Sequence, residues 1–263
     1  MAVDVACWGG LIPGSEPWLD DLVREGVCGF KSFLVDSGVP EFPPMTIVEL
    51  RTALPDLTRL GVPLLLHAED PARLHPMTGD ARSYGRYLES RPASCEAEAI
   101  GVALTLGRES GGQIHILHVS SADAVDVLRT TGPGISAETC PHYLTFTAER
   151  IGIGATEFKC APPIRGTAHR EALWEALGDG TLAMIVSDHS PSPPELKEVD
   201  SGNFGAAWGG ISSLQIRLQA TWTEASQRGF GFDELTEWLS AAPARSCKSP
   251  CRACRLRGLP CRG

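Results

Sequence analysis

Short β-rich runs alternate with helix-like stretches along most of the chain. Six runs are expected to be strands: VDVACW (3–8), GFKSFLV (29–35), VPLLLH (62–67), QIHILHV (113–119), ISAETC (135–140) and LAMIVS (182–187). Helix-like stretches separate them at 16–25, 46–60, 94–109, 121–130 and 169–177, and two more follow at about 211–228 and 232–242. Several runs are apolar on both faces, as in a parallel sheet covered by helices, so the pattern predicts an α/β fold. Pro55 predicts a kink or an early end in the second helix.

Polar side chains at the strand ends favour one parallel architecture over another. Six strands suit a doubly wound sheet, whereas a closed (β/α)8 barrel needs eight. Candidate chemical groups lie within or just after five different runs, at Lys31, His67, His118, 139–142 and Asp188. A site assembled from many strand ends is typical of a barrel, and no GxGxxG or Walker loop follows any strand. We therefore expect a (β/α)8 TIM barrel that is incomplete here, with about six βα units.

Composition excludes several classes of protein. The net charge of −9 argues against a nucleic-acid partner held by phosphate contacts. No apolar run approaches the ~20 residues of a membrane span, so no membrane partner is expected. The start, MAVDVACWGG, lacks the features of a secretory signal, which predicts a cytoplasmic location. The odd count of nine cysteines favours reduced thiols over a disulfide framework.

The last residues differ in composition from the rest. Residues 1–245 are expected to form the partial barrel, and 246–263 a Cys/Arg-rich, unstructured tail. The tail contains Cys247, Cys251, Cys254 and Cys261, whose C-x3-C-x2-C-x6-C spacing is compatible with zinc binding through four thiolates. A composition break at a single residue is better explained by an altered reading frame or a splice junction.

Two histidines and an aspartate at separate strand ends suggest a metal site. Neutral imidazole and carboxylate are ligands for Zn²⁺ and similar ions, and the set His67, His118 and Asp188 indicates metal more strongly than any single member. A lone strand-end histidine is more often structural. Because His115 and His118 are three apart, they are expected on opposite strand faces. His118 is the one predicted to face the barrel mouth, and His115 is predicted to pack or hydrogen-bond.

Lys31 lies within an apolar run, where a lysine is costly unless it is paired or modified. One possibility is a salt bridge to Asp36 or Glu69. The other is carbamylation of the amine by CO₂, which produces an anion able to bridge two cations. Both remain open at this point.

Seven segments carry a resemblance to a known family. GFKSFLVDSGVPEFP, LLLHAEDP, HILHVSSADA, ETCPHYLTF, FKCAPPIR, VSDHSPSPPELK and AWGGISSLQ resemble the allantoinases of the amidohydrolase superfamily, in matching order across about 3–245. Shorter pieces occur in dihydropyrimidinases, hydantoinases and dihydroorotases, and the last two segments favour allantoinase. The resemblance implies a metal-dependent barrel enzyme with two divalent ions, zinc by preference, that hydrolyses allantoin to allantoate in purine catabolism. It also implies a homo-oligomer, a tetramer in the family, and a small-molecule substrate.

The resemblance assigns roles to individual residues. Lys31 resembles the carboxylated lysine that bridges the two metals, and His67 and His118 resemble the ligands of the second metal. Asp188 resembles a metal ligand that also transfers protons, first as general base and then as general acid.

Further positions resemble elements around the substrate. Cys160, with its loop at 160–163, and Ser190 resemble residues that face the substrate. For His142, in CPHY, a role beside the metal site and a purely structural role are both open.

One family motif is missing. The family pattern begins with an HxH on the first barrel strand, which supplies two ligands of the first metal, and the chain contains no HxH. The run at 3–8 would then correspond to the third barrel strand. Two alternatives stay open beside allantoinase. One is a dihydropyrimidinase- or hydantoinase-type hydrolase. The other, favoured by the missing HxH, is a truncated, inactive chain that lacks the first-metal histidines and either associates with full-length subunits or has no stable role.

Overall fold

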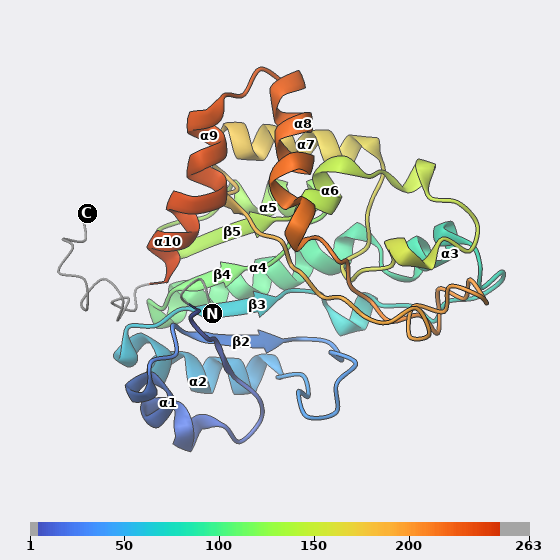
Figure 1. Ribbon diagram of the computed structural model, residues 1–263. Helices are drawn as coiled ribbons and strands as arrows, with labels where there is room; N and C mark the ends of the chain where they lie inside the picture. The colour runs from blue at the N-terminus through green and yellow to red at the C-terminus, as the bar shows by residue number, and fades with distance from the viewer. Residues whose placement is uncertain (1–4, 248–263) are drawn as a thin grey trace.

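The computed structural model describes residues 5–247, and the cysteines predicted as a tail zinc site at 251, 254 and 261 lie outside that range. A six-stranded parallel sheet runs through it in the order β1-β2-β3-β4-β5-β6 (Figure 1). The strands are β1 (Gly9–Gly10), β2 (Phe30–Phe33), β3 (Leu64–His67), β4 (Ile114–Ile116), β5 (Ile135–Thr139) and β6 (Met184–Ile185). Each strand is parallel to the one before it. The order confirms the predicted partial barrel of about six units.

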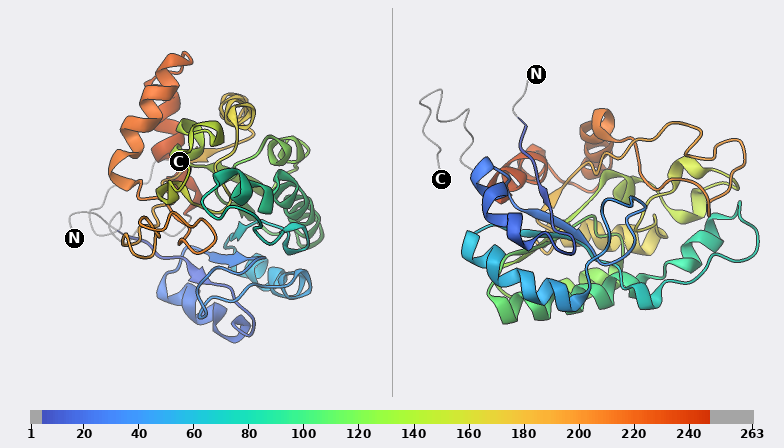
Figure 2. Two further views of the ribbon diagram at one scale, coloured as in Figure 1. Left: turned by 90° about the vertical axis from the view of Figure 1, so that its right-hand side faces the viewer. Right: turned by 90° about the horizontal axis from the view of Figure 1, so that it is seen from below.

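Helices surround the strands in an arc (Figure 2). The predicted helices correspond to α1 (Leu19–Glu25), α2 (Ile47–Leu60), α4 (Ala93–Ser110), α5 (Ala122–Leu128), α7 (Thr167–Gly178), α8 (Arg217–Gln227), α9 (Phe232–Thr236) and α10 (Ala242–Ser246). A π-helix at Glu237–Ala241 joins the last two. Two short helices were not predicted: α3 (Tyr84–Ser90) and α6 (Pro141–Thr145).

Helix α2 shows how local sequence sets its limits. Thr46 and Glu49 form a capping box at its start, and Gly61 ends it in the left-handed conformation at φ 69°. Pro55 lies inside the helix, which continues to Leu60, so the expected early end is wrong. The capping box and the four buried residues on its inner face stabilise the helix across the proline.

The first strand lies later in the chain than predicted. The pairing residues are Gly9 and Gly10, opposite Phe30 and Lys31, and not the apolar run at 3–8. A Cβ atom on Gly9 would lie 2.6 Å from the Phe30 ring, so only glycine permits this approach of the two strands. Val5 is exposed, which removes the burial that the prediction assumed.

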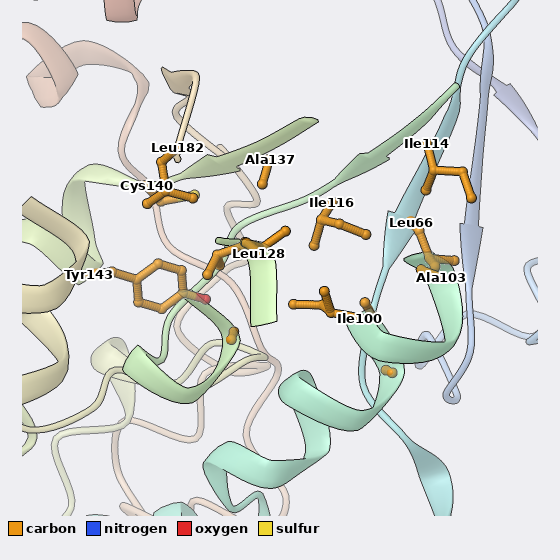
Figure 3. Packing of buried hydrophobic residues seen from close by; sticks show 14 of the residues in the cluster. Leu66, Ile100, Ala103, Ile114, Ile116, Leu128, Ala137, Cys140, Tyr143 and Leu182 are labelled. Carbon is orange, nitrogen blue, oxygen red and sulfur yellow. The ribbon is translucent and has the colours of Figure 1, made fainter. Parts of the chain in front are cut away.

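The core lies between the strands and the helices that cover them. Figure 3 shows side chains of β3, β4 and β5 packed against α4 and α5. Buried members of this layer include Leu66, Ile100, Ala103, Ile114, Ile116, Leu128 and Ala137. Burying such side chains stabilises the fold by about 1.5–3 kcal/mol each, which holds the strand ends in fixed positions.

Two further features bear on the sequence predictions. Cys28 and Cys247 form a disulfide with their Cα atoms 5.5 Å apart, so the expectation of reduced thiols is wrong for this pair. The fold brings together residues that lie 219 positions apart, which spacing alone could not reveal. Within residues 5–247 no helix has the length and apolar character required to cross a membrane.

Candidate active site

A cavity of about 890 Å³ opens on the side of the sheet where the strands end. The segment that follows β6, coloured orange in Figure 1, runs along this side. All six predicted site residues line the cavity: Lys31, His67, His118, Cys160, Asp188 and Ser190. The structure thus brings together residues from β2, β3 and the segments after β4, β5 and β6.

Lys31 lies on β2 with its Nζ atom 4.8 Å from the centre of the Phe33 ring. Neither carboxylate suggested by the salt-bridge hypothesis pairs with it in the described part of the chain. Asp36 Oδ1 accepts a hydrogen bond from the Gly38 amide, and Glu69 pairs with other groups. Lys31 therefore offers its amine to the cavity.

His67 and His118 face each other, with His67 Nδ1 3.0 Å from His118 Nε2. The second nitrogen of His118, Nδ1, is buried and has no hydrogen-bond partner among residues 5–247. Burial and the neighbouring His67 lower the pKa of His118 to about 3, so its ring is neutral at neutral pH. Two facing imidazoles, of which His118 is neutral and has a free nitrogen, are chemically suited to hold a cation.

His118 and Asp188 share an unusual backbone conformation. Their φ angles are 39° and 41°, in the region that non-glycine residues rarely adopt. Burial alone would raise the pKa of Asp188, but the nearby His118 and His142 outweigh it and the pKa lies below its ordinary value. Asp188 is therefore ionised at neutral pH. Such conformations cluster at functional sites.

Glu69 and Arg91 orient His67, and the sequence analysis did not identify this role. Glu69 Oε2 lies 2.7 Å from His67 Nε2, and Arg91 donates two hydrogen bonds to the same carboxylate, at 3.0 and 2.6 Å. Glu69 is fully buried, so only paired donors make its charge tolerable. The signal available was its place in LLLHAEDP, two residues after the predicted ligand His67.

His142 lies beside Asp188 and not on the protein surface. One ligand atom each from Cys140, His142 and Asp188 lies within 4.8 Å of the others. Both ring nitrogens of His142 are buried without a partner in the described part of the chain, and burial lowers its pKa to about 4. In residues 5–247, His142 therefore makes none of the ring hydrogen bonds that a purely structural histidine would make.

Buried tyrosines hold the segment that contains Cys160. The Tyr87 hydroxyl donates to the Cys160 carbonyl oxygen at 2.7 Å, and the Tyr143 hydroxyl donates to that of Pro162 at 2.6 Å. Burial raises the pKa of the Cys160 thiol to about 12, so the thiol is protonated. Cys160 thus lines the cavity and does not act as a nucleophile.

Two lysines near the cavity were missed. Lys159 lines it, and burial together with the positive charges of Arg91 and Lys197 lowers its pKa to about 8. Lys197 donates from Nζ to the Lys159 carbonyl oxygen at 2.9 Å. Both lie in segments that carried the family resemblance, but no spacing rule pointed to them.

His115 lies elsewhere, as predicted. Its ring nitrogens contact Ser136 Oγ at 2.7 Å and Glu138 Oε2 at 2.9 Å. It lines a second cavity, of about 1150 Å³, which reaches residues before the strands, such as Pro63 and Gln113, and shares Lys31 and Asp188 with the first cavity. The strand ends at Ile116, so His118 lies beyond it and simple alternation of faces does not apply.

Comparison with known proteins agrees with the motifs. The chain is 44% identical over 248 residues to the allantoinase of Streptomyces avermitilis, covering 92% of this chain and 55% of that protein. It is 43% identical over 249 residues to the mitochondrial allantoinase of Aquarana catesbeiana, covering 93% and 51%. The chain is a homologue of the allantoinases. It spans about half the length of these curated relatives, and no family model matches it.

Solved structures share the fold of this allantoinase homologue. L-hydantoinase (dihydropyrimidinase) from Arthrobacter aurescens superposes with a TM-score of 0.86 at 30% identity, over 94% of this chain and 56% of the hydantoinase. A D-hydantoinase superposes with a TM-score of 0.80 at 25% identity. The resemblance to the allantoinases and the incomplete barrel are both confirmed, and the individual site roles remain predictions.

Proposed function

We propose that this chain carries part of the catalytic site of an allantoinase, a cyclic amide hydrolase that converts allantoin to allantoate in purine catabolism. The observation that carries the proposal is the convergence of Lys31, His67, His118 and Asp188 on one cavity. The chain is 42–44% identical to proteins named allantoinase over 92–93% of its length, and the segments that contain these four residues resemble that family.

Divalent metal ions, zinc by preference, are the cofactors we propose. The unpartnered, buried Nδ1 of His118 and the facing nitrogens of His67 and His118 support this assignment. Lys31, carboxylated by CO₂, would bridge two ions. When bound, the ions would lower the pKa of water and polarise the substrate carbonyl. Because the sequence has no HxH, it lacks the two histidine ligands of the first metal. It provides the ligands of the second metal and, for the first metal, only the ligands that the two metals share.

Asp188 is the group we assign to proton transfer. It is ionised at neutral pH and lines the cavity, so it accepts the proton of the attacking water as general base. As the ring C–N bond breaks, Asp188 returns that proton to the leaving nitrogen. The water oxygen bonds to the ring carbonyl carbon, so this oxygen and the original carbonyl oxygen become the carboxylate of the open product, and the remaining proton goes to solvent.

Cys160 and Ser190 are proposed to contact the substrate. Both line the cavity, and the Ser190 amide donates to the Ile211 carbonyl oxygen at 3.1 Å, which fixes its position. Gly210 has a φ of 145° and lies against Ser190, where a side chain would not fit. We propose that the enzyme is cytoplasmic and homotetrameric.

A hydantoinase- or dihydropyrimidinase-type activity is the second candidate, because the superposed solved structures are hydantoinases. The deciding experiment loads the 263-residue chain with Zn²⁺ and measures turnover of allantoin, hydantoin and dihydrouracil. We expect allantoin to be hydrolysed fastest. Preference for either other substrate would favour the second candidate, and no turnover of any would establish the inactive alternative for this chain.

A further inference from the structure

Cys140, His142 and Asp188 form a cluster of potential ligands at the ends of β5 and β6. One donor atom from each lies within 4.8 Å of the other two. Cys140 is a free, fully buried thiol, and only Asp188 belongs to the ligand set assigned above. The cluster thus contains two metal-binding side chains that the proposed hydrolysis does not use.

His142 provides a second, independent observation. The residue is only 2% exposed, and neither ring nitrogen has a hydrogen-bond partner among the residues that the structure describes. Buried polar groups nearly always have a partner, and an unsatisfied one costs about 1–3 kcal/mol. A bound group that accepts electron density from the ring would remove this cost.

The donor set indicates which group fits. Thiolate, imidazole and carboxylate together are the ligands of zinc and related thiophilic cations. Bond lengths of 2.0–2.3 Å in a tetrahedral site place donor atoms about 3.3–3.8 Å apart. The three donor atoms lie within 4.8 Å of one another, about 1 Å wider than this range, so a bound ion would draw them together.

We infer that Cys140, His142 and Asp188 form a mononuclear site for a thiophilic divalent cation, with its fourth position open to the cavity that Asp188 lines. On binding, Cys140 loses its proton to solvent and its sulfur becomes a ligand. The site is distinct from the His67–His118 pair and does not depend on the proposed hydrolysis. It shares Asp188 with that pair, so occupation of one site affects the other.

Cobalt(II) titration of the intact chain tests the inference, because a thiolate–cobalt bond produces a charge-transfer absorption band that imidazole and carboxylate ligands do not. The background carries Cys251→Ser, Cys254→Ser and Cys261→Ser, which removes the tail cysteines as ligands. We expect the band to saturate at one cobalt per chain. Cys140→Ser should abolish it, and the matched control Cys95→Ser, another buried free cysteine, should retain it.

A second pair of variants covers the case in which Cys140→Ser does not fold. His142→Gln should keep the thiolate but weaken cobalt binding by at least the roughly 10–100-fold that loss of an outer-shell partner causes. His67→Gln should leave the band intact, since that residue is outside the cluster. Circular dichroism checks the fold of each variant. Absence of the band, or a band unchanged by both Cys140→Ser and His142→Gln, would overturn the inference whether or not allantoin is hydrolysed.

Discussion

His67 Nε2 lies 2.7 Å from Glu69 Oε2, and Arg91 holds the other side of the same carboxylate. Because Nε2 is occupied, Nδ1 is the nitrogen of His67 that faces His118. A carboxylate that fixes the orientation of a ligand histidine is a common feature of metal sites. Glu69 is therefore a positioning residue for the proposed ligand pair.

Removing the Glu69 carboxylate should destabilise the fold. Glu69→Ala leaves Arg91 without its partner in a mostly buried setting, so we expect a loss of about 3–5 kcal/mol in the free energy of unfolding. Urea denaturation measures this loss. Glu98→Ala, which removes an exposed pair with Arg73, is the control and should cost less than about 1 kcal/mol. Equal effects of the two variants would contradict the positioning role.

Acid should weaken the same contact. Burial raises the pKa of Glu69, but the hydrogen bond with His67 and the charge of Arg91 outweigh it, and the pKa lies well below its usual range. A carboxyl with a depressed folded pKa contributes stability above the unfolded value of about 4.3 and loses it as the pH falls. Unfolding midpoints measured from pH 6 downward should fall more steeply for the wild type than for Glu69→Gln.

His142 should produce a separate loss at higher pH. Its folded pKa is about 4, below the unfolded value of about 6.5, because burial penalises the charged ring. The unfolded chain therefore binds the extra proton first, and stability present above pH 6.5 declines between about 6.5 and 4. In metal-free protein, His142→Gln should remove of the order of 3 kcal/mol of this pH dependence. Parallel wild-type and variant curves would contradict it.

The disulfide between Cys28 and Cys247 should contribute to stability. It closes a loop of 219 residues, and losing a native disulfide typically costs about 2–5 kcal/mol. We expect reduction with dithiothreitol, or Cys28→Ser, to lower the urea midpoint. Cys95→Ser, in which a free thiol is changed, controls for loss of the sulfur atom. A midpoint insensitive to reductant would show that the bond adds no stability.

Asp188→Asn tests proton transfer directly. If the zinc-loaded chain hydrolyses allantoin, loss of the general base should lower kcat by about 10²–10⁴-fold. Asp123→Asn, an exposed aspartate on α5, is the matched control. A kcat within a few-fold of the wild type would remove Asp188 from the proton-transfer role.

The sequence predicted those strands whose own residues form a recognisable strand pattern. Five of the six strand runs contain the observed strands, because apolar residues on both faces mark a buried parallel strand. The first failed because β1 consists of two glycines, whose role depends on the Phe30 ring that packs against them. Only the folded structure supplies that contact.

Some residues of the candidate site could likewise be predicted from the sequence, and others could not. Lys31, His67 and Asp188 lie in or directly after strands, and residues in that position converge at one edge of a parallel sheet. The contribution of Arg91 was not predictable, because it reaches Glu69 from a segment 22 residues away. The pairing of His142 with Cys140 and Asp188 likewise depends on backbone angles that no spacing rule encodes.

The sheet order has a consequence for how the chain acquires its structure. Every strand after β1 is paired with its predecessor in the sequence, so each of them finds a partner that is already made. Pairing with the preceding strand closes a shorter loop than pairing with any earlier strand, so less loop-closure entropy opposes it. The ribosome releases the amino end first, at about 5–20 residues per second, so each βα unit can add to the one before it during synthesis. The two ligand-bearing ends of β3 and β6 therefore meet only when the last unit has emerged.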